Sequence, residues 1–276
     1  MNRMVILVSM AMFAVPLFEM TPADVDACLA GLNARQCRYA GRVADLARAA
    51  IGTPYAPDPL GEGPGAPYDA DPLMDLSKVD CVTFVEQTLA LAAAKSYRDA
   101  FDLLQKIRYR NGEIAFENRN HFMVADWIGS NAFCKNVTDS LGAATEKSTR
   151  TIGRRHFYTL KQIETLAATA VDEEMTLDYV PAASAATAEA ELPSPALILL
   201  IGKTDWLFTL HCGLFIRDED GGLFYHASSK EEKVAAAPFP SIFNGTSRYI
   251  GFTAYEINSP AANCAFSDCG VPIKQK

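Results

Sequence analysis

The stretch Asp80-Cys81-Val82-Thr83-Phe84-Val85-Glu86 decides how this chain folds around its chemistry. It follows a segment rich in Pro and Gly and begins an apolar pattern at helical spacing, which predicts a helix from Cys81 to about Ser96. The N-terminus of a helix stabilises a thiolate. Cys81 is therefore a candidate nucleophile, although a single cysteine is more often a buried core residue.

Two histidines far downstream are candidate partners for this thiol. His211 lies in the segment 210–216 and His226 in the segment 223–227, and both segments have the pattern of strands joined by a turn. If residues 217–220 form the turn, His211 lies directly opposite His226 and both point to the same face. A slip of one residue would send them to opposite faces.

This register gives each residue a role. Cys81 would be the nucleophile, and His211 would take its proton and later protonate a leaving amine. His226 would fix the tautomer of His211, and the backbone N–H of Cys81 would stabilise an oxyanion. The alternative interpretation is that both histidines are ordinary sheet residues with satisfied hydrogen bonds.

Several motifs together resemble an NlpC-type cell-wall cysteine hydrolase, most closely the branch of N-acetylmuramoyl-L-alanine amidases. The motifs are Gly52-Thr53-Pro54-Tyr55, the Asp80 to Glu86 run, Leu210-His211-Cys212-Gly213, His226-Ala227-Ser228-Ser229 and, for that branch, Arg119-Asn120-His121-Phe122-(x)4-Trp127. The resemblance spans about residues 50–255. One departure is Pro193-Ser194-Pro195-Ala196-Leu197, where related sequences carry a Pro-x-Gly-Asp turn.

The resemblance implies a papain-like fold, a triad of Cys81, His211 and His226, and hydrolysis of an amide in peptidoglycan or its fragments. The leading candidate is the bond between the muramoyl lactyl group and L-Ala. The alternative is a γ-D-glutamyl-diamino-acid endopeptidase that uses the same triad within the peptide stem. A non-catalytic wall-binding module is the alternative of another class.

The same matching assigns candidate substrate residues. Tyr55 and Asp80 would line the catalytic pocket, whereas Arg119 and His121 would lie in the substrate cleft. We expect no cofactor and no metal. The sequence contains no Cys-x-x-Cys pair, and Cys264 and Cys269 have no neighbouring histidine, so a zinc site is not expected.

Composition places the chain among ordinary globular proteins. It has 276 residues, of which 49% are hydrophobic and 21% charged. Helices come first and an antiparallel sheet last, which is typical of an α+β fold. We expect a single catalytic domain over residues 21–276 with insertions around 57–75 and 131–192, the latter with an Ala-rich surface connection over 181–191. The net charge of -8 argues against a nucleic-acid partner.

The first residues have the pattern of a secretory signal. Arg3 precedes an apolar run from Met4 to Val15, which ends before Pro16 and Glu19. We therefore expect residues 1–20 to be a signal peptide and the protein to be periplasmic or extracellular, with no stable membrane span in the mature chain. A buried N-terminal helix is the alternative.

The seven cysteines favour an oxidising compartment. Two pairs that are close in sequence look like local disulfides, Cys28 with Cys37 and Cys264 with Cys269. Cys134 and Cys212 are either buried free thiols or a third pair. Cys81 is then the one thiol kept free for chemistry.

Overall fold

The computed structural model describes residues 15–35, 38–218 and 221–260. Its longer helices are α1 (Pro22–Ala34), α2 (Tyr39–Ala49), α3 (Cys81–Ala93) and α4 (Tyr97–Arg108). The shorter ones are α5 (Ile128–Ser130), α6 (Arg154–Leu160), α7 (Glu164–Thr169) and α8 (Ala185–Glu189), with a π-helical turn at Met123–Trp127 before α5.

The strands follow mainly in the second half of the chain. They are β1 (Cys134–Asn136), β2 (Glu146–Ile152), β3 (Glu173–Pro181), β4 (Ala196–Gly202), β5 (Thr209–Asp218), β6 (Gly221–Ser228), β7 (Lys233–Pro238) and β8 (Tyr249–Ile257). They form one antiparallel sheet in the order β2-β3-β8-β4-β5-β6-β7, and β1 pairs with β8. The fold is therefore a mixed α+β arrangement of helices and an antiparallel sheet.

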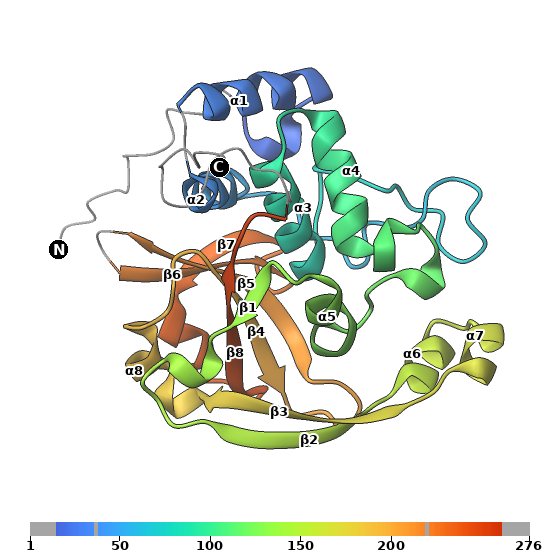
Figure 1. Cartoon of the computed structure of the whole chain (residues 1–276), viewed down its shortest axis with the longest axis vertical. Coiled ribbons are helices and arrows are strands. Elements are labelled where there is room, and N and C mark those ends of the chain that lie inside the picture. The colour runs from blue at the N-terminus through green and yellow to red at the C-terminus, as the bar shows by residue number, and fades with distance from the viewer. Residues whose placement is uncertain (1–14, 36–37, 219–220, 261–276) are drawn as a thin grey trace, which may run out of the picture.

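The helices α1 to α4 gather on one side of the sheet, whereas α6 and α7 lie at the far end of the β2–β3 ribbon (Figure 1). The central strand β4 is buried along its whole length, which explains its continuous apolar run. Its alternate residues contribute to different cores: Leu199 packs with Leu89 of α3, and Leu200 packs with Phe224 and Phe252 on the other face. Helix α3 is thus fixed against the middle of the sheet, with its first residue near the start of β5.

The structure confirms most of the elements that the sequence predicted. Helix α3 begins at Cys81 as predicted, and β5 and β6 contain the predicted strand segments 210–216 and 223–227. The expected surface connection over 181–191 is largely exposed or half-buried, but it contains α8, whose Ala185 and Ala188 are buried. The strands β1, β2, β3 and β7 were not predicted.

The predicted hairpin register is also wrong, by two residues. Asp218 pairs with Gly221 and Leu214 with Tyr225, so the strands extend further than expected and leave only positions 219–220 between them. Continuing this ladder, His226 lies opposite Gly213 and not opposite His211. Because side chains alternate with a period of two, a shift of two keeps both histidines on one face.

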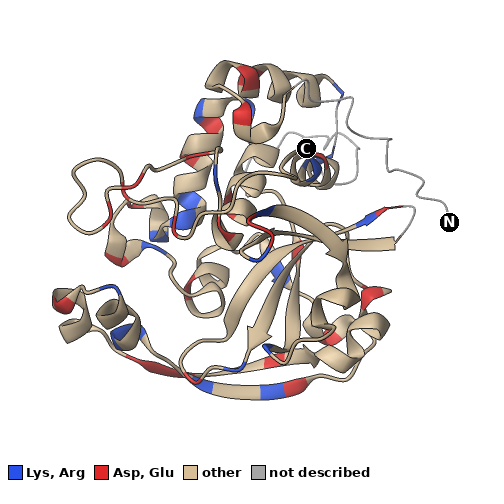
Figure 2. Ribbon diagram, turned by 180° about the vertical axis from the view of Figure 1, so that it is seen from behind, with Lys and Arg blue, Asp and Glu red and all other residues tan. Residues whose placement is uncertain are grey.

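Charged residues of both signs are distributed over the described elements (Figure 2). Along the β2–β3 ribbon, for example, Lys147 lies opposite Asp178 and forms an ion pair with it. The expected disulfide of Cys28 is not formed, since this thiol is free; Cys37, Cys264 and Cys269 lie outside the described residues. Most of the expected signal peptide, residues 1–14, lies outside them too. Among the residues that are described, no helix is both long and apolar enough to span a membrane.

Candidate active site

Cys81 is the first residue of α3, and a capping box fixes the helix at this point. The Asp80 carboxylate accepts a hydrogen bond of 2.8 Å from the backbone N–H of Thr83, and the Thr83 hydroxyl accepts one of 2.9 Å from the backbone N–H of Asp80. The helix therefore cannot begin earlier or later without losing two hydrogen bonds. The thiol of Cys81, which is half-buried, lies at the positive end of the helix dipole.

The hairpin brings the two predicted histidines together despite its corrected register. Nε2 of His211 lies 2.7 Å from Nδ1 of His226, and the two rings meet edge to face. The ring of Phe224 stacks on His226, with centroids 5.1 Å apart, and fixes its plane. Gly213 makes room for this ring, since a Cβ there would lie 2.7 Å from Phe224 Cζ. Diagonal neighbours on one face thus achieve the contact that directly opposed residues were expected to make.

The surroundings of Cys81 favour its ionised form. A hydrogen bond with the Cys212 side chain, followed by a hydrogen bond with His211 and the positive charge of that ring, holds the pKa of Cys81 well below its usual range, against the opposing effect of burial. This pKa shift joins the thiol to the histidine pair. Cys81, His211 and His226 therefore form one connected group.

His226 is the neutral member of that group. Burial, with a smaller contribution from the charge of His211, lowers the pKa of His226 to about 4. At neutral pH its Nδ1 can accept a hydrogen bond from the Nε2–H of His211, which leaves Nδ1 of His211 for the thiol. The contact therefore selects the tautomer and orientation of His211.

Tyr55 and Asp80, the two residues expected to line the pocket, lie close to Cys81. Tyr55 forms a bridge with Val79, and burial, followed by the negative charges of Cys81 and Asp80, raises the pKa of Tyr55. Burial and then the Cys81 charge raise the pKa of Asp80 to about 6. Burial raises the pKa of Tyr249 at the start of β8, and the negative charge of Cys81 adds to this rise. Sequence reasoning missed Tyr249, because nothing marks an aromatic residue at a strand start as part of a site.

Arg119 and His121, the residues expected in the substrate cleft, have partners within the protein. Arg119 forms ion pairs with Glu62 and with Asp69, the latter at 2.8 Å. Nε2 of His121 lies 2.8 Å from the carbonyl oxygen of Phe116. Their contact with substrate stays a prediction. The visible role of Arg119 is to hold the irregular segment between α2 and α3, whereas His121 packs against Phe116 and Phe157.

A network of buried hydrogen bonds and an ion pair ties α3 to neighbouring elements, and sequence reasoning missed it. Arg108 of α4 donates a 2.7 Å hydrogen bond to Glu86 and one of 2.9 Å to the carbonyl oxygen of Leu60. The other oxygen of Glu86 accepts a 2.9 Å hydrogen bond from the indole of Trp127. Glu86 belongs to the motif that begins with Asp80, so its presence on an apolar helix was the available signal.

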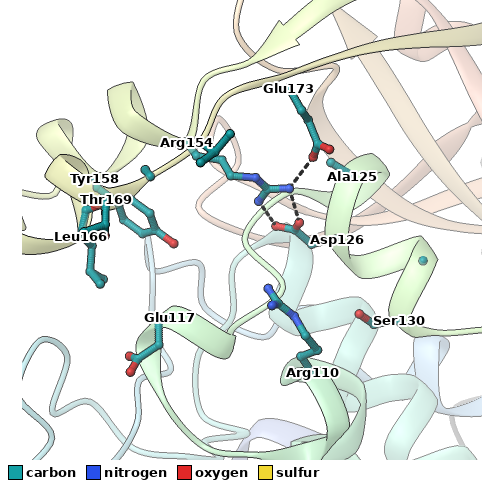
Figure 3. A pocket seen from close by; sticks show the side chains of 13 residues that line it. Arg110, Glu117, Ala125, Asp126, Ser130, Arg154, Tyr158, Leu166, Thr169 and Glu173 are labelled. Carbon is teal, nitrogen blue, oxygen red and sulfur yellow. Dashed lines mark hydrogen bonds and ion pairs between the residues drawn. The ribbon is translucent and has the colours of Figure 1, made fainter.

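A separate polar cavity of about 640 Å³ lies between α5 and the α6–α7 pair (Figure 3). Arg154 reaches into it and is paired with Asp126 at 2.7 Å and with Glu173 at 2.6 Å. Arg110, Glu117 and Tyr158 lie on its other walls. These ion pairs join α6 to the turn before α5 and to β3, so the cavity wall is built from three distant parts of the sequence.

Within the described residues, no cluster of three or more His, Cys, Asp or Glu side chains has the arrangement of a metal site. The thiol of Cys81 and the imidazoles of His211 and His226 are the titratable groups that meet at the start of α3. Together with the fold, they define a mixed α+β protein that presents one activated thiol at a helix start beside a histidine pair.

A family model described as AmiA-like, N-acetylmuramoyl-L-alanine amidase-like, matches residues 45–246, and the chain belongs to this family. The matched region contains α3, His211, His226 and the segments 57–75 and 131–192 that the sequence predicts to be insertions. Membership in this family indicates an amidase-like protein with a cell-wall substrate.

Solved structures share the fold. The protein LPG0564 from Legionella pneumophila superposes with a TM-score of 0.78 at 23% identity, over 87% of this chain and 95% of that one. An N-acetylmuramoyl-L-alanine amidase from Bacteroides uniformis superposes with a TM-score of 0.62 at 22% identity, over 80% of this chain and 99% of that one. No functionally curated protein matches the sequence.

Proposed function

We propose that this protein is a papain-like cysteine amidase that hydrolyses the bond between the lactyl group of N-acetylmuramic acid and L-Ala in peptidoglycan or its fragments. The observation that carries the proposal is the 2.7 Å contact between His211 and His226 beside a thiol of lowered pKa. A nucleophile, a base and an orienting group in this order are what acyl transfer requires. The family and the Bacteroides uniformis structure support the choice of bond.

The reaction begins with the thiolate of Cys81 and the protonated ring of His211. The sulfur attacks the lactyl carbonyl carbon, and the carbonyl oxygen becomes an oxyanion that the backbone N–H of Cys81 can bind. His211 then gives its proton to the nitrogen of L-Ala, the C–N bond breaks, and the stem peptide leaves as an amine. His226 stabilises the protonated state of His211, because its neutral ring accepts a hydrogen bond from the Nε2–H of His211.

The second half of the reaction releases the sugar. The muramoyl group is now a thioester on Cys81, and His211 is neutral. His211 removes a proton from water, the hydroxide attacks the thioester carbonyl, and the sulfur leaves as a thiolate that again faces a protonated His211. The products are a sugar with a free lactyl carboxylate and an intact stem with a free amine.

The decisive experiment is digestion of purified disaccharide-tetrapeptide muropeptides followed by mass spectrometry of the products. We expect free disaccharide and intact stem. A shortened stem that is still attached to the sugar would instead identify the endopeptidase, and an unchanged muropeptide would support a wall-binding module. Cys81→Ala should abolish cleavage, whereas Cys28→Ala, which removes a free thiol on α1, should not.

We further infer that the protein is exported, from the basic and apolar order of its first residues. A fusion of residues 1–20 to an alkaline phosphatase reporter tests this, since that enzyme becomes active only after export to an oxidising compartment. Activity that persists after deletion of residues 4–15 from the fusion would refute the inference.

A further inference from the structure

Cys212 contacts the proposed nucleophile more closely than any catalytic role requires. Its Sγ lies 3.2 Å from the carbonyl oxygen of Cys81, within hydrogen-bond distance. Hydrogen bonding with the side chain and the backbone of Cys212 lowers the pKa of Cys81. Cys212 follows His211 on β5, so its side chain points to the opposite face, toward α3. The two thiols thus lie side by side across the junction of α3 and β5.

The two sulfurs differ in access to solvent. Cys81 is half-buried at the helix start, whereas Cys212 has no exposed surface at all. Residue Cys81 thus keeps part of its surface in contact with solvent, and Cys212 can meet Cys81 only from inside the protein. This is the arrangement of a reactive thiol with a resolving thiol behind it.

We propose that Cys81 and Cys212 form a reversible disulfide when the protein meets a hydroperoxide. In the first step the Cys81 thiolate attacks the distal peroxide oxygen, the O–O bond breaks, and Cys81 becomes a sulfenic acid. The released alkoxide or hydroxide takes the proton of His211 and leaves as an alcohol or water. In the second step the Cys212 sulfur attacks the Cys81 sulfur, and the sulfenic oxygen leaves as water with the proton of Cys212. Two thiols are oxidised to one disulfide, and one hydroperoxide is reduced.

The first step favours the second. The pKa of Cys212 is raised well above its usual range by its hydrogen bond with Cys81, then by burial and by the negative charge of Cys81. Oxidation of Cys81 to a sulfenic acid removes that charge, so Cys212 becomes easier to deprotonate when its attack is needed. The disulfide then protects Cys81 from irreversible oxidation to a sulfinic acid.

The other described thiols lack this contact. Cys28 lies on α1 and Cys134 on β1, and neither shares a hydrogen bond with Cys81 within the described residues. Burial alone raises the pKa of Cys134 to about 12, so it is inert at neutral pH. Cys134 is therefore the matched control for Cys212: both are buried thiols at strand positions, and only one touches Cys81.

The test is treatment of the full-length protein with a small excess of hydrogen peroxide, followed by peptide mapping under non-reducing conditions. We expect one peptide pair linked through Cys81 and Cys212, with a loss of two hydrogens in mass that dithiothreitol reverses. This readout is independent of catalysis. Loss and recovery of muropeptide cleavage in step with the disulfide rests on the proposed function and is measured separately.

Variants separate a resolving role from a structural one. In Cys212→Ala, and in Cys212→Val as a second variant that refills the volume, Cys81 should gain two or three oxygens irreversibly, whereas Cys134→Ala should behave as the wild type. Recovery of reduced Cys81 should fall at least tenfold in either Cys212 variant. The proposal is overturned if the wild-type map contains no Cys81–Cys212 link, or if the Cys212 variants recover as fully as the wild type.

Discussion

His226 illustrates how burial turns one side chain into the orienting group for another. Its pKa of about 4 keeps the ring neutral at physiological pH, and Phe224 fixes its plane beside His211. In the proposed reaction the ring acts through its 2.7 Å contact with His211. A carboxylate in the same place would add a negative charge, whereas the neutral imidazole only orients the ring of His211.

This geometry predicts that His226→Ala lowers kcat/KM for muropeptide cleavage by about 10²- to 10⁴-fold, with a smaller change in KM. His226→Gln retains an acceptor near the same position and should recover part of the loss. The check is steady-state kinetics of both variants, with circular dichroism to establish that the hairpin is intact. Equal activity of His226→Ala and the wild type would remove His226 from the mechanism.

His121 links the aromatic cluster near Phe116 to the pH dependence of stability. Burial lowers the pKa of His121 to about 3, far below the usual value of 6.5. The unfolded chain therefore takes up more protons than the folded protein at any pH between these values, and stability falls as the pH drops through this window. Burial of His226 acts in the same direction between pH 6.5 and about 4.

Between pH 7.5 and pH 5, we expect the free energy of unfolding to fall by about 2 kcal/mol less in His121→Phe than in the wild type, because Phe fills the site without titrating. Urea unfolding of both proteins at the two pH values measures the difference. The comparison removes the opposing contribution of Asp80, whose raised pKa favours the folded state as the pH falls and is common to both proteins. An unchanged pH dependence would mean that His121 is solvated in solution.

At the scale of elements, the start of α3 couples helix capping to thiol chemistry. Asp80 caps the helix, and its carboxylate and the Cys81 thiolate repel each other. Asp80→Asn should keep the cap and make Cys81 more acidic, whereas Asp80→Ala should lose the cap and cost about 1 kcal/mol of stability. The rate of iodoacetamide alkylation against pH reports the thiol, and urea unfolding reports the cap. A higher alkylation midpoint in Asp80→Asn would contradict the repulsion.

The buried pair of Glu86 and Arg108 ties α3 to α4. Arg108→Met leaves the Glu86 carboxylate without its cation at a position where both side chains are almost inaccessible. We expect a loss of about 3–5 kcal/mol, and a smaller loss in the double variant Glu86→Gln/Arg108→Met, where no charge is left unpaired. Urea unfolding of the single and double variants measures both. If the double variant is less stable than the single one, the unpaired charge is not the cause.

Elements whose pattern is dictated by burial could be predicted from the sequence, and those dictated by tertiary pairing could not. The helix at Cys81 and the strand at Leu199 have apolar periods set by the core on which they pack. The β2–β3 ribbon is largely exposed, and the alternation of Thr149 and Arg150 gives no apolar face to detect. The prediction that His211 and His226 share a face holds, because a register shift of two residues leaves side chains on the same face. The shift itself was missed because the turn was expected to contain four residues.

At the scale of the whole molecule, the two insertions predicted around 57–75 and 131–192 meet in space. Lys161 after α6 forms an ion pair with Asp58, and the hydroxyl of Tyr68 lies 3.1 Å from that of Thr165 on α7. These exposed contacts join the α6–α7 pair, at the end of its ribbon in Figure 1, to the segment that precedes α3. Exposed contacts of this kind are each weak.

We therefore expect Lys161→Met/Thr165→Ala to loosen α6 and α7 without unfolding the protein. Hydrogen exchange in residues 154–169 should become roughly two- to fivefold faster, which corresponds to about 0.5–1 kcal/mol. Lys147→Met, which breaks an exposed ion pair with Asp178 elsewhere on the ribbon, is the control and should leave this exchange unchanged. Equal exchange in all three proteins would show that α6 and α7 are held by other contacts.

The irregular segment between α2 and α3 has a consequence for the thermodynamics of substrate capture. It lacks helices and strands, yet Arg108 binds its Leu60 carbonyl oxygen, Tyr109 binds that of Gly61, and Arg119 binds its Asp69 carboxylate. Ordering a free backbone costs about 1–2 kcal/mol for every residue fixed. Here that entropy is lost during folding, so a ligand that binds against this segment loses no affinity to the ordering of its backbone.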